Sequence, residues 1–235
     1  MEKLIEISGL CKSYDRTVVL RDLDMTLEPG RIVGLLGPNG CGKTTLIKII
    51  TGLIHDYTGS VHIAGQPPGI ESKAIISYLP DHIYLDGGMR AKDAILHFAD
   101  FYEDFDLMKA LELLGRFKLD SNQRLSAMSK GMQERLQLVL VMSRAARVYL
   151  LDEPLGGVDP AARNAILDMI LNNYSENAAV LLSTHLIQDV ERIFDSVLML
   201  NEGQIVINDT VDNIRSQYGK SVNEVFQEVF ACSVN

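Results

Sequence analysis

The sequence predicts an α/β fold with a mainly parallel sheet and an inserted helical stretch. Short apolar segments typical of buried strands alternate with helical patterns along most of the chain, and this alternation favours a parallel sheet covered by helices. Between about residues 89 and 127 the alternation stops, and apolar residues recur at helical spacing without a strand signal. The 235 residues are enough for one large core, so we interpret residues 1–235 as a single domain.

Composition excludes several classes of protein. Hydrophobic residues make up 47% and charged residues 23%, which is unlike a disordered chain, a collagen repeat or a disulfide scaffold. The net charge is −9 and no basic patch is present, which argues against a nucleic-acid partner. No apolar run reaches the ~18–20 residues that span a bilayer, and no signal peptide is visible. Three dispersed cysteines, Cys11, Cys41 and Cys232, favour reduced thiols in a cytosol.

The first third of the chain predicts strands around one helix. Apolar–polar alternation predicts half-exposed strands, and short apolar runs predict buried ones. The expected elements are strands over 4–7 and 18–27 around a turn at 12–16, a buried strand over 32–36, a helix over 43–51, and strands over 61–64 and 75–79.

The remaining two thirds combine the helical stretch with further α/β alternation. In the helical stretch an aromatic stripe of Phe98, Tyr102 and Phe105 is either buried or faces a partner, and burial is the favoured alternative. Strands are then expected over 148–151, 179–183 and 197–200, and helices over 161–173 and 186–194. Near the end, Ser221 and Glu224 form a capping-box pattern before an apolar stripe over 222–230, which we expect to pack on the parent domain rather than on a partner.

A glycine-rich motif lies between the strand expected over 32–36 and the helix expected over 43–51. It matches G-x-x-x-x-G-K-[ST], and its residues are Gly37, Pro38, Asn39, Gly40, Cys41, Gly42, Lys43, Thr44 and Thr45. Such a loop points backbone N–H groups at phosphate oxygens, and the helix N-terminus adds positive charge. Lys43 would contact the β- and γ-phosphates and the Thr44 hydroxyl would bind Mg²⁺. The alternative is a glycine-rich turn that caps a helix.

Two carboxylates follow the apolar strand expected over 148–151. In a parallel sheet, ligands bind beyond the carboxyl ends of the strands, where Asp152 and Glu153 would emerge. Asp152 would hold Mg²⁺ through water and Glu153 would polarise a water that attacks the γ-phosphate. Cys41 lies at a helix N-terminus, a setting that lowers a thiol pKa, so we expect alkylation of Cys41 to inactivate the protein and MgATP to protect it. An inert small filler is the alternative for Cys41.

Beyond these motifs, the chain resembles the ATP-binding subunits of ABC transporters over nearly its whole length. Residues 129–135, S-K-G-M-Q-E-R, resemble the signature motif of that family, although Met128, Lys130 and Met132 depart from its consensus. The S-K-G-M pattern is similar to that of an exporter branch of bacterial ABC ATPases. The resemblance implies that Ser129 and Gly131 contact ATP held by a second subunit, whereas an ordinary N-cap is the alternative for Ser129.

The resemblance assigns roles to further residues. It implies that Tyr14 stacks on adenine, that Asp159 of Gly157-Val158-Asp159-Pro160 links the two nucleotide sites, and that His185 contacts the γ-phosphate. Asp81 stands where the family usually has a glutamine that touches Mg²⁺ or the attacking water. The shorter, charged Asp81 can still bind Mg²⁺ through water. Structural alternatives are a packed tyrosine, a helix-capping aspartate and a structural histidine.

The fold and assembly implied by the resemblance complete the expectation. They are a P-loop NTPase core, an N-terminal antiparallel β subdomain, a helical subdomain over about 82–145 and a C-terminal helical tail over about 211–231. The protein would be an ATPase that dimerises, with itself or with a paralogous subunit, around two ATP and Mg²⁺. It would drive an integral membrane permease from the cytoplasmic face of the cell membrane. His82, Tyr84 and Leu85 would lie where the family docks that permease. Alternatives are a soluble ABC ATPase of translation or DNA repair and a P-loop kinase.

Overall fold

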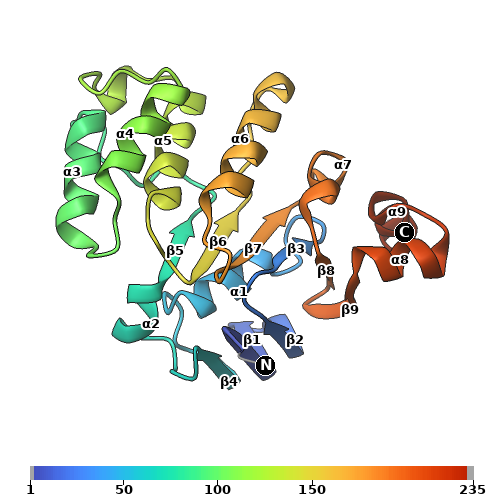
Figure 1. Cartoon of the computed structure of the whole chain (residues 1–235). Coiled ribbons are helices and arrows are strands. Elements are labelled where there is room, and N and C mark those ends of the chain that lie inside the picture. The colour runs from blue at the N-terminus through green and yellow to red at the C-terminus, as the bar shows by residue number, and fades with distance from the viewer. Residues whose placement is uncertain (1–2, 232–235) are drawn as a thin grey trace.

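The computed structural model describes residues 3–231 and contains two sheets with α1 (Lys43–Ile50) between them (Figure 1). The smaller sheet is antiparallel, in the order β2-β1-β4, with β1 at Ile5–Tyr14, β2 at Thr17–Leu27 and β4 at Thr58–Ile63. The predicted turn at 12–16 is wrong for its first three residues, because β1 continues through register shifts until Tyr14 pairs with Thr17. The turn itself is Asp15–Arg16, and Asp15 has φ 50°.

The larger sheet is mainly parallel, as the sequence predicts. Its order is β5-β6-β7-β3-β8-β9, and only β9 runs antiparallel to its neighbour. The strands are β3 (Ile32–Leu36), β5 (Ile76–Leu79), β6 (Val148–Asp152), β7 (Ala179–Thr184), β8 (Ser196–Asn201) and β9 (Gln204–Thr210). The chain order and the strand order differ, so β3, β6 and β7 end side by side and deliver the loops that follow them to one edge of the sheet.

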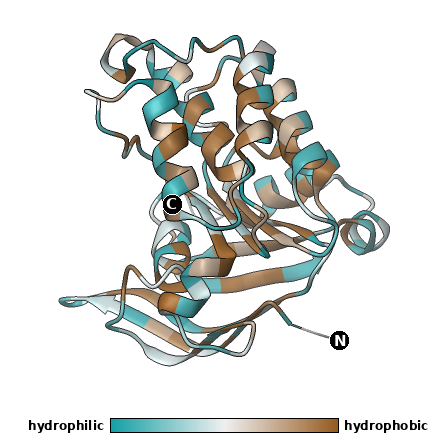
Figure 2. Ribbon diagram, turned by 60° about the vertical axis from the view of Figure 1, so that its left-hand side comes forward, coloured by the Kyte–Doolittle hydropathy of each residue, from teal (hydrophilic) through white to brown (hydrophobic). Residues whose placement is uncertain are grey.

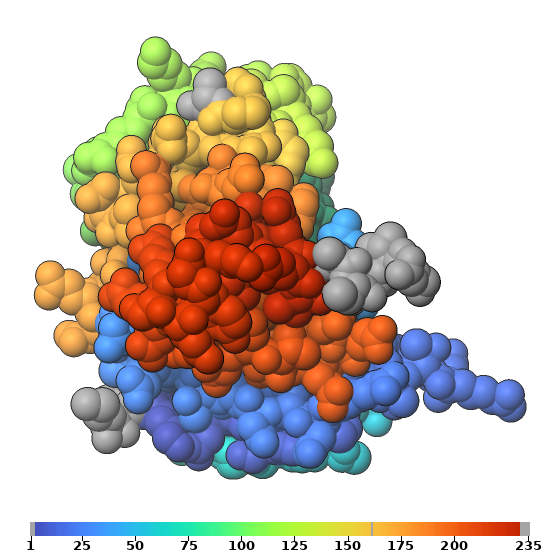
Figure 3. All heavy atoms as spheres, turned by 90° about the vertical axis from the view of Figure 1, so that its right-hand side faces the viewer, coloured from blue at the N-terminus to red at the C-terminus, as the bar shows by residue number. Residues whose placement is uncertain are grey.

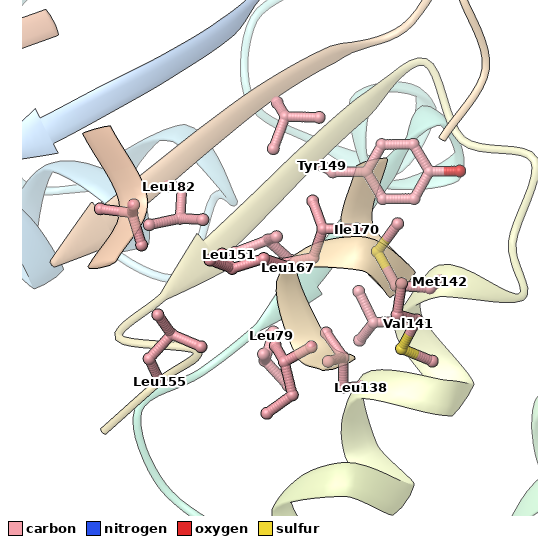
Figure 4. Close-up of a cluster of buried hydrophobic side chains, with 14 of the residues drawn as sticks. Leu79, Leu138, Val141, Met142, Tyr149, Leu151, Leu155, Leu167, Ile170 and Leu182 are labelled. Carbon is pink, nitrogen blue, oxygen red and sulfur yellow. The ribbon is translucent and has the colours of Figure 1, made fainter. Parts of the chain in front are cut away.

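The two faces of the larger sheet bury different partners. One face packs on α1 and the smaller sheet through a single apolar cluster. The other face packs on α5 (Lys130–Met142) and α6 (Pro160–Asn173), and Figure 4 shows Leu138 and Val141 of α5 beside Leu151 of β6 and Leu167 of α6. Apolar ribbon accordingly concentrates in the strands and on the inward sides of the helices (Figure 2).

The predicted helical stretch contains α3 (Ala91–Phe101), α4 (Leu107–Arg116) and the 3₁₀ turn η1 (Leu125–Ala127), followed by α5. A further short helix, α2 (Ile70–Ile75), precedes β5 and has no clear sequence signal. Phe98 is buried, and its ring lies 5.4 Å from that of Tyr102 and 5.9 Å from that of Phe105. Tyr102 and Phe105 are half-buried against the same core, so the stripe packs within the helical segment, as favoured, although Phe98 and Tyr102 also line a hollow there.

Arg144, just after α5, ties the helical segment to the larger sheet. Its side chain is 2% exposed and donates to the Asp104 carboxylate at 2.8 and 3.0 Å. It also donates to the carbonyls of Ile76 and Ala74, both at 2.5 Å, and lies 3.8 Å from the centre of the Tyr102 ring. One side chain thus joins the α3–α4 connection to the start of β5.

The C-terminal part packs on the edge of the domain (Figure 3). It consists of α7 (Ile187–Val190), the 3₁₀ turn η2 (Glu191–Ile193), α8 (Val211–Tyr218) and α9 (Val222–Ala231). The single helix expected over 186–194 is two short turns, and the sequence does not predict β9. Both α8 and α9 fall within the helical tail expected over about 211–231. The Ser221–Glu224 capping box is present, and Val222 and Val225 are buried, so the stripe packs on its parent domain. Within residues 3–231, no helix has the length and apolar character needed to cross a membrane.

Candidate nucleotide site

The phosphate loop connects β3 to α1. Gly42 is the N-cap of α1 with φ 113°, and a Cβ there would lie 2.8 Å from Leu20 and 3.1 Å from the Val19 carbonyl of β2. A Cβ on Gly37 would lie 2.4 Å from the Leu200 carbonyl of β8. Glycine is therefore required at both positions because the loop passes between two strands. Pro38, Asn39 and Gly40 are exposed, while Thr44 and Thr45 are half-buried on the first turn of the helix.

The Lys43 side chain is held inside this loop. It is 6% exposed, and its Nζ donates to the carbonyls of Gly37 at 2.8 Å and Pro38 at 3.1 Å. The same Nζ lies 3.9 Å from Oε1 of Glu153. The cation is thus fixed at the loop by backbone carbonyls, close to the carboxylate of Glu153, which follows β6.

Asp152 ends β6 beside the phosphate loop and is 1% exposed. The Ser183 hydroxyl of β7 donates to its Oδ1, whereas Oδ2 is buried and has no partner among the described residues. Burial raises the pKa of Asp152, and the hydrogen bond from Ser183 and the nearby Thr44 hydroxyl oppose that rise. A buried carboxylate with one oxygen in need of a partner is a typical ligand arrangement for a divalent cation.

The oxygen donors present fit Mg²⁺. Thr44 supplies a hydroxyl and Asp152 a carboxylate, and Mg²⁺ in nucleotide sites is commonly held by one or two such groups together with phosphates and water. No cluster of three or more His, Cys, Asp or Glu occurs within residues 3–231, so this fit depends on phosphate oxygens completing the shell. When bound, Mg²⁺ would neutralise charge on the phosphates.

Glu153 and His185 meet at the same edge. Glu153 has φ 52°, a left-handed conformation that costs about 1–3 kcal/mol in a residue other than glycine. Its backbone N–H donates to Ser183, and its Oε2 lies 3.0 Å from Nδ1 of His185, which follows β7. The strained backbone turns the carboxylate toward Lys43 and His185, where a water could be held between carboxylate and phosphate.

Cys41 corrects an expectation. Its side chain is buried, and burial raises the pKa of the thiol even though Lys43 opposes the rise. The helix N-terminus therefore does not make Cys41 a reactive thiolate, and the alternative of a small inert filler is favoured. Cys11 is also a free thiol, and Cys232 lies outside the described residues.

Asp81 lies on the loop after β5. Its Oδ1 is 2.9 Å from Nδ1 of His82, and its side chain is 44% exposed. Gln137 of α5 anchors this loop, because its amide accepts from the backbone of Tyr84 at 3.0 Å and donates to the carbonyl of His82 at 3.3 Å. Asp81 is thus near Asp152, whose pKa its charge raises, without being bonded to it.

The other predicted residues lie apart from the phosphate loop. Ser129 caps α5 by accepting from the Met132 N–H at 3.3 Å, and a Cβ on Gly131 would meet open space. Tyr14 is 45% exposed at the end of β1, with Lys12 Nζ 4.6 Å from its ring centre. Asp159 precedes α6 without a side-chain capping bond. None of the hydrogen bonds described for these residues reaches residues 37–45.

A hollow of about 970 Å³ lies between β5, α2 and the helical segment. Its lining includes several aromatic side chains, among them Phe101, which is 72% exposed, and Tyr84, which is 41% exposed. His82 also lines it, whereas Leu85 packs against the core. Charged residues also line it, among them Lys48, Lys73 and Glu103.

A protein that binds and hydrolyses nucleoside triphosphates is defined by this glycine-rich loop and its lysine, together with the two carboxylates at the carboxyl end of β6. The family model described as ABC transporter matches residues 20–156. The chain therefore belongs to the ABC transporter family as an ATP-binding subunit, and it is an ATPase.

Similar proteins agree with this assignment. The ABC-type transporter ATP-binding protein EcsA of Bacillus subtilis is 31% identical over 92% of this chain and 91% of that protein. The Nod factor export ATP-binding protein I of Rhizobium johnstonii is 29% identical over 94% of this chain and 74% of that protein. A solved ATP-binding subunit of an ABC transporter superposes with a TM-score of 0.87, at 30% identity, over 96% of this chain and 99% of that one.

Sequence reasoning missed several residues of the site. In the sequence, Ser183 is only part of the segment before His185. In the structure its hydroxyl donates to the Asp152 carboxylate and accepts from the Glu153 backbone N–H. Gln137 is a polar residue inside an apolar helix, and that pattern is the one available signal of its role. Tyr78 and Arg144 carry no sequence signal of their function.

Proposed function

We propose that this ATPase pairs with a second ATPase subunit around two ATP and drives a membrane permease. ATP would bind with its phosphates in the loop over residues 37–45, with Lys43 and Mg²⁺ at the β- and γ-phosphates and with Thr44, Asp152 and Asp81 around the ion. Glu153 would orient the attacking water, and His185 would contact the γ-phosphate. Tyr14 would stack on the adenine.

The position of residues 129–131 is the observation that carries the dimer. Lys130 is 75% exposed and pairs with Glu134 of its own helix at 3.7 Å, and Ser129 and Gly131 likewise bond to residues of α5 in the described part of the chain. An exposed, serine-capped helix N-terminus is suited to bind an anion. Since it does not contact its own phosphate loop, it is available to the nucleotide of another subunit.

ATP would then stabilise the closed pair because its terminal phosphate contacts both subunits. Hydrolysis removes those contacts and favours opening, so the nucleotide shifts an equilibrium between two states through its different affinity for them. A separate permease would convert opening and closing into transport, docking a segment in the hollow beside Tyr84 and Phe101. Export is the favoured direction, because one relative named above is an export protein. The paired copy would be identical or paralogous, at the cytoplasmic face of the membrane.

Ser129→Arg in a Glu153→Gln background tests the shared site. The bulky cation should abolish ATP-dependent dimerisation, measured by light scattering, while each monomer still binds ATP. Ser216→Arg on α8 is the matched control, since Ser216 is exposed and bonds within its own helix. Dimerisation that persists in Ser129→Arg would refute the shared ATP site. Loss of dimerisation in Ser216→Arg as well would refute the placement of that site at residue 129.

A soluble ABC ATPase of translation or DNA repair is the second candidate. It would need no permease, whereas the aromatic hollow at Tyr84 and Phe101 favours a docked protein segment. Phe101→Glu should abolish co-purification of a multi-span membrane protein from native membranes without changing ATP binding. Co-purification of ribosomes or DNA-repair proteins in its place would support the second candidate.

A further inference from the structure

Two buried polar atoms near the end of β6 have no hydrogen-bond partner among the described residues. They are the hydroxyl of Tyr78 on β5 and Oδ2 of Asp152 on β6. Leaving a buried donor or acceptor unsatisfied costs about 1–3 kcal/mol, so each such atom calls for an explanation. One of the two is a donor and the other is an acceptor.

Tyr78 and Asp152 lie on the same face of the larger sheet. Tyr78 pairs with Leu150, and Asp152 is two residues further along the same strand. Because side chains alternate along a strand, Leu150 and Asp152 face the same side as Tyr78, and the two Cα atoms are about 8 Å apart from strand spacing and rise. Tyr78 packs against the apolar cluster that includes residues of α1, the helix that carries Thr44.

The Tyr78 hydroxyl is not exposed in the hollow that the residue lines. The residue contributes to the wall of the hollow, yet its oxygen is buried. Burial raises the pKa of Tyr78, and the charges of Asp152 and Asp81 raise it further, so the group stays a protonated donor. Tyr78 therefore borders the hollow, while its buried hydroxyl lies within electrostatic range of the Asp152 carboxylate.

We propose that Tyr78 is a positioning residue of the metal site, whose hydroxyl donates a hydrogen bond into the outer shell of the Mg²⁺ held by Thr44 and Asp152. The proposal rests on the function proposed above. Outer-shell donors orient the ligands of a bound ion, and their loss weakens metal affinity. Since the same ring forms part of the wall of the hollow, a segment that docks there touches a residue of the metal site directly.

The test is a Mg²⁺ titration of Tyr78→Phe with a non-hydrolysable ATP analogue, followed by the thermal unfolding midpoint. We expect half-saturation to need about tenfold more Mg²⁺ than in the wild type. Without nucleotide or metal, the midpoint of Tyr78→Phe should equal or exceed that of the wild type, because the variant removes an unsatisfied hydroxyl.

Tyr149→Phe is the matched control. Its buried hydroxyl donates to the Arg144 carbonyl at 2.5 Å, so that variant should lower the midpoint without changing Mg²⁺ half-saturation. If Tyr78→Phe reached half-saturation at the wild-type Mg²⁺ concentration, the inference would be overturned. A metal-free unfolding midpoint that fell as much as that of Tyr149→Phe would overturn it too, because the Tyr78 hydroxyl would then already have a hydrogen-bond partner. A wild-type protein whose midpoint did not respond to Mg²⁺ and analogue would instead refute the proposed nucleotide site, and this inference with it.

Discussion

Replacing Arg144 by methionine tests how the helical segment is held to the larger sheet. Methionine keeps most of the apolar stem but none of the donors, so the variant loses the two bonds to Asp104 and the two bonds to the carbonyls of Ala74 and Ile76. The substitution therefore isolates the polar part of this connection.

The expected loss follows from which groups stay buried. Breaking a buried ion pair by removing one partner costs about 3–5 kcal/mol. Asp104 is 26% exposed and regains water, which favours the lower end of that range. The bond to Ile76 is fully buried, which favours the higher end. We expect the free energy of unfolding to fall by about 4 kcal/mol, within the range of a buried pair.

Urea denaturation of the full chain measures this loss through the midpoint at constant slope. Arg144→Lys keeps the charge but not the fork of donors, so it should recover less than half of the loss. Hydrogen exchange should accelerate in α3 and α4 before it does in β6, because the bonds removed join that segment to β5. A loss below about 1 kcal/mol, the level of an exposed ion pair, would refute the reasoning.

Three further predictions concern the nucleotide site. Glu153→Gln should bind ATP normally and hydrolyse it about a hundredfold more slowly or worse, and unchanged turnover in a phosphate-release assay would exclude Glu153 as the base. Burial raises the pKa of Asp152, so the folded protein holds the carboxyl proton of Asp152 more tightly than the unfolded chain and loses stability as pH rises from about 4. In metal-free denaturation, Asp152→Asn should therefore gain stability relative to the wild type as pH rises above about 4. A stability difference between the two proteins that does not change with pH would contradict this. The Cys41 thiol should be alkylated more slowly than free cysteine at neutral pH, because its raised pKa keeps it protonated. If peptide mapping found Cys41 labelled as fast as free cysteine, its burial would be contradicted.

The sequence predicts the parallel core well because local pattern and tertiary environment agree there. Val148–Asp152 is buried throughout, so its apolar run has one consistent interpretation. The sequence predicts β9 poorly. This edge strand has every second residue exposed, including Asn208 and Thr210, so its composition resembles that of a loop. The helix at 187–193 is broken into two turns by packing that local propensity does not report.

The candidate site divides in the same way. Lys43, Thr44, Asp152 and Glu153 are adjacent to strong strand and helix signals, so spacing alone places them at one edge. The roles of Ser183 and Tyr78 depend on which strands are neighbours, which is a property of the topology and not of either segment. The thiol of Cys41 was mispredicted because burial outweighs the helix N-terminus, and burial of a single side chain cannot be inferred from its neighbours in sequence.

Gly42 has a consequence for the strand it touches. Its missing Cβ would fall between Leu20 and the Val19 carbonyl, so β2 lies directly against the phosphate loop. The phosphate loop therefore limits the size of the side chains that β2 tolerates at Val19 and Leu20, although neither residue belongs to the candidate nucleotide site. A library that varied β2 for stability should therefore also be screened for nucleotide affinity at Leu20, whose side chain lies against the loop.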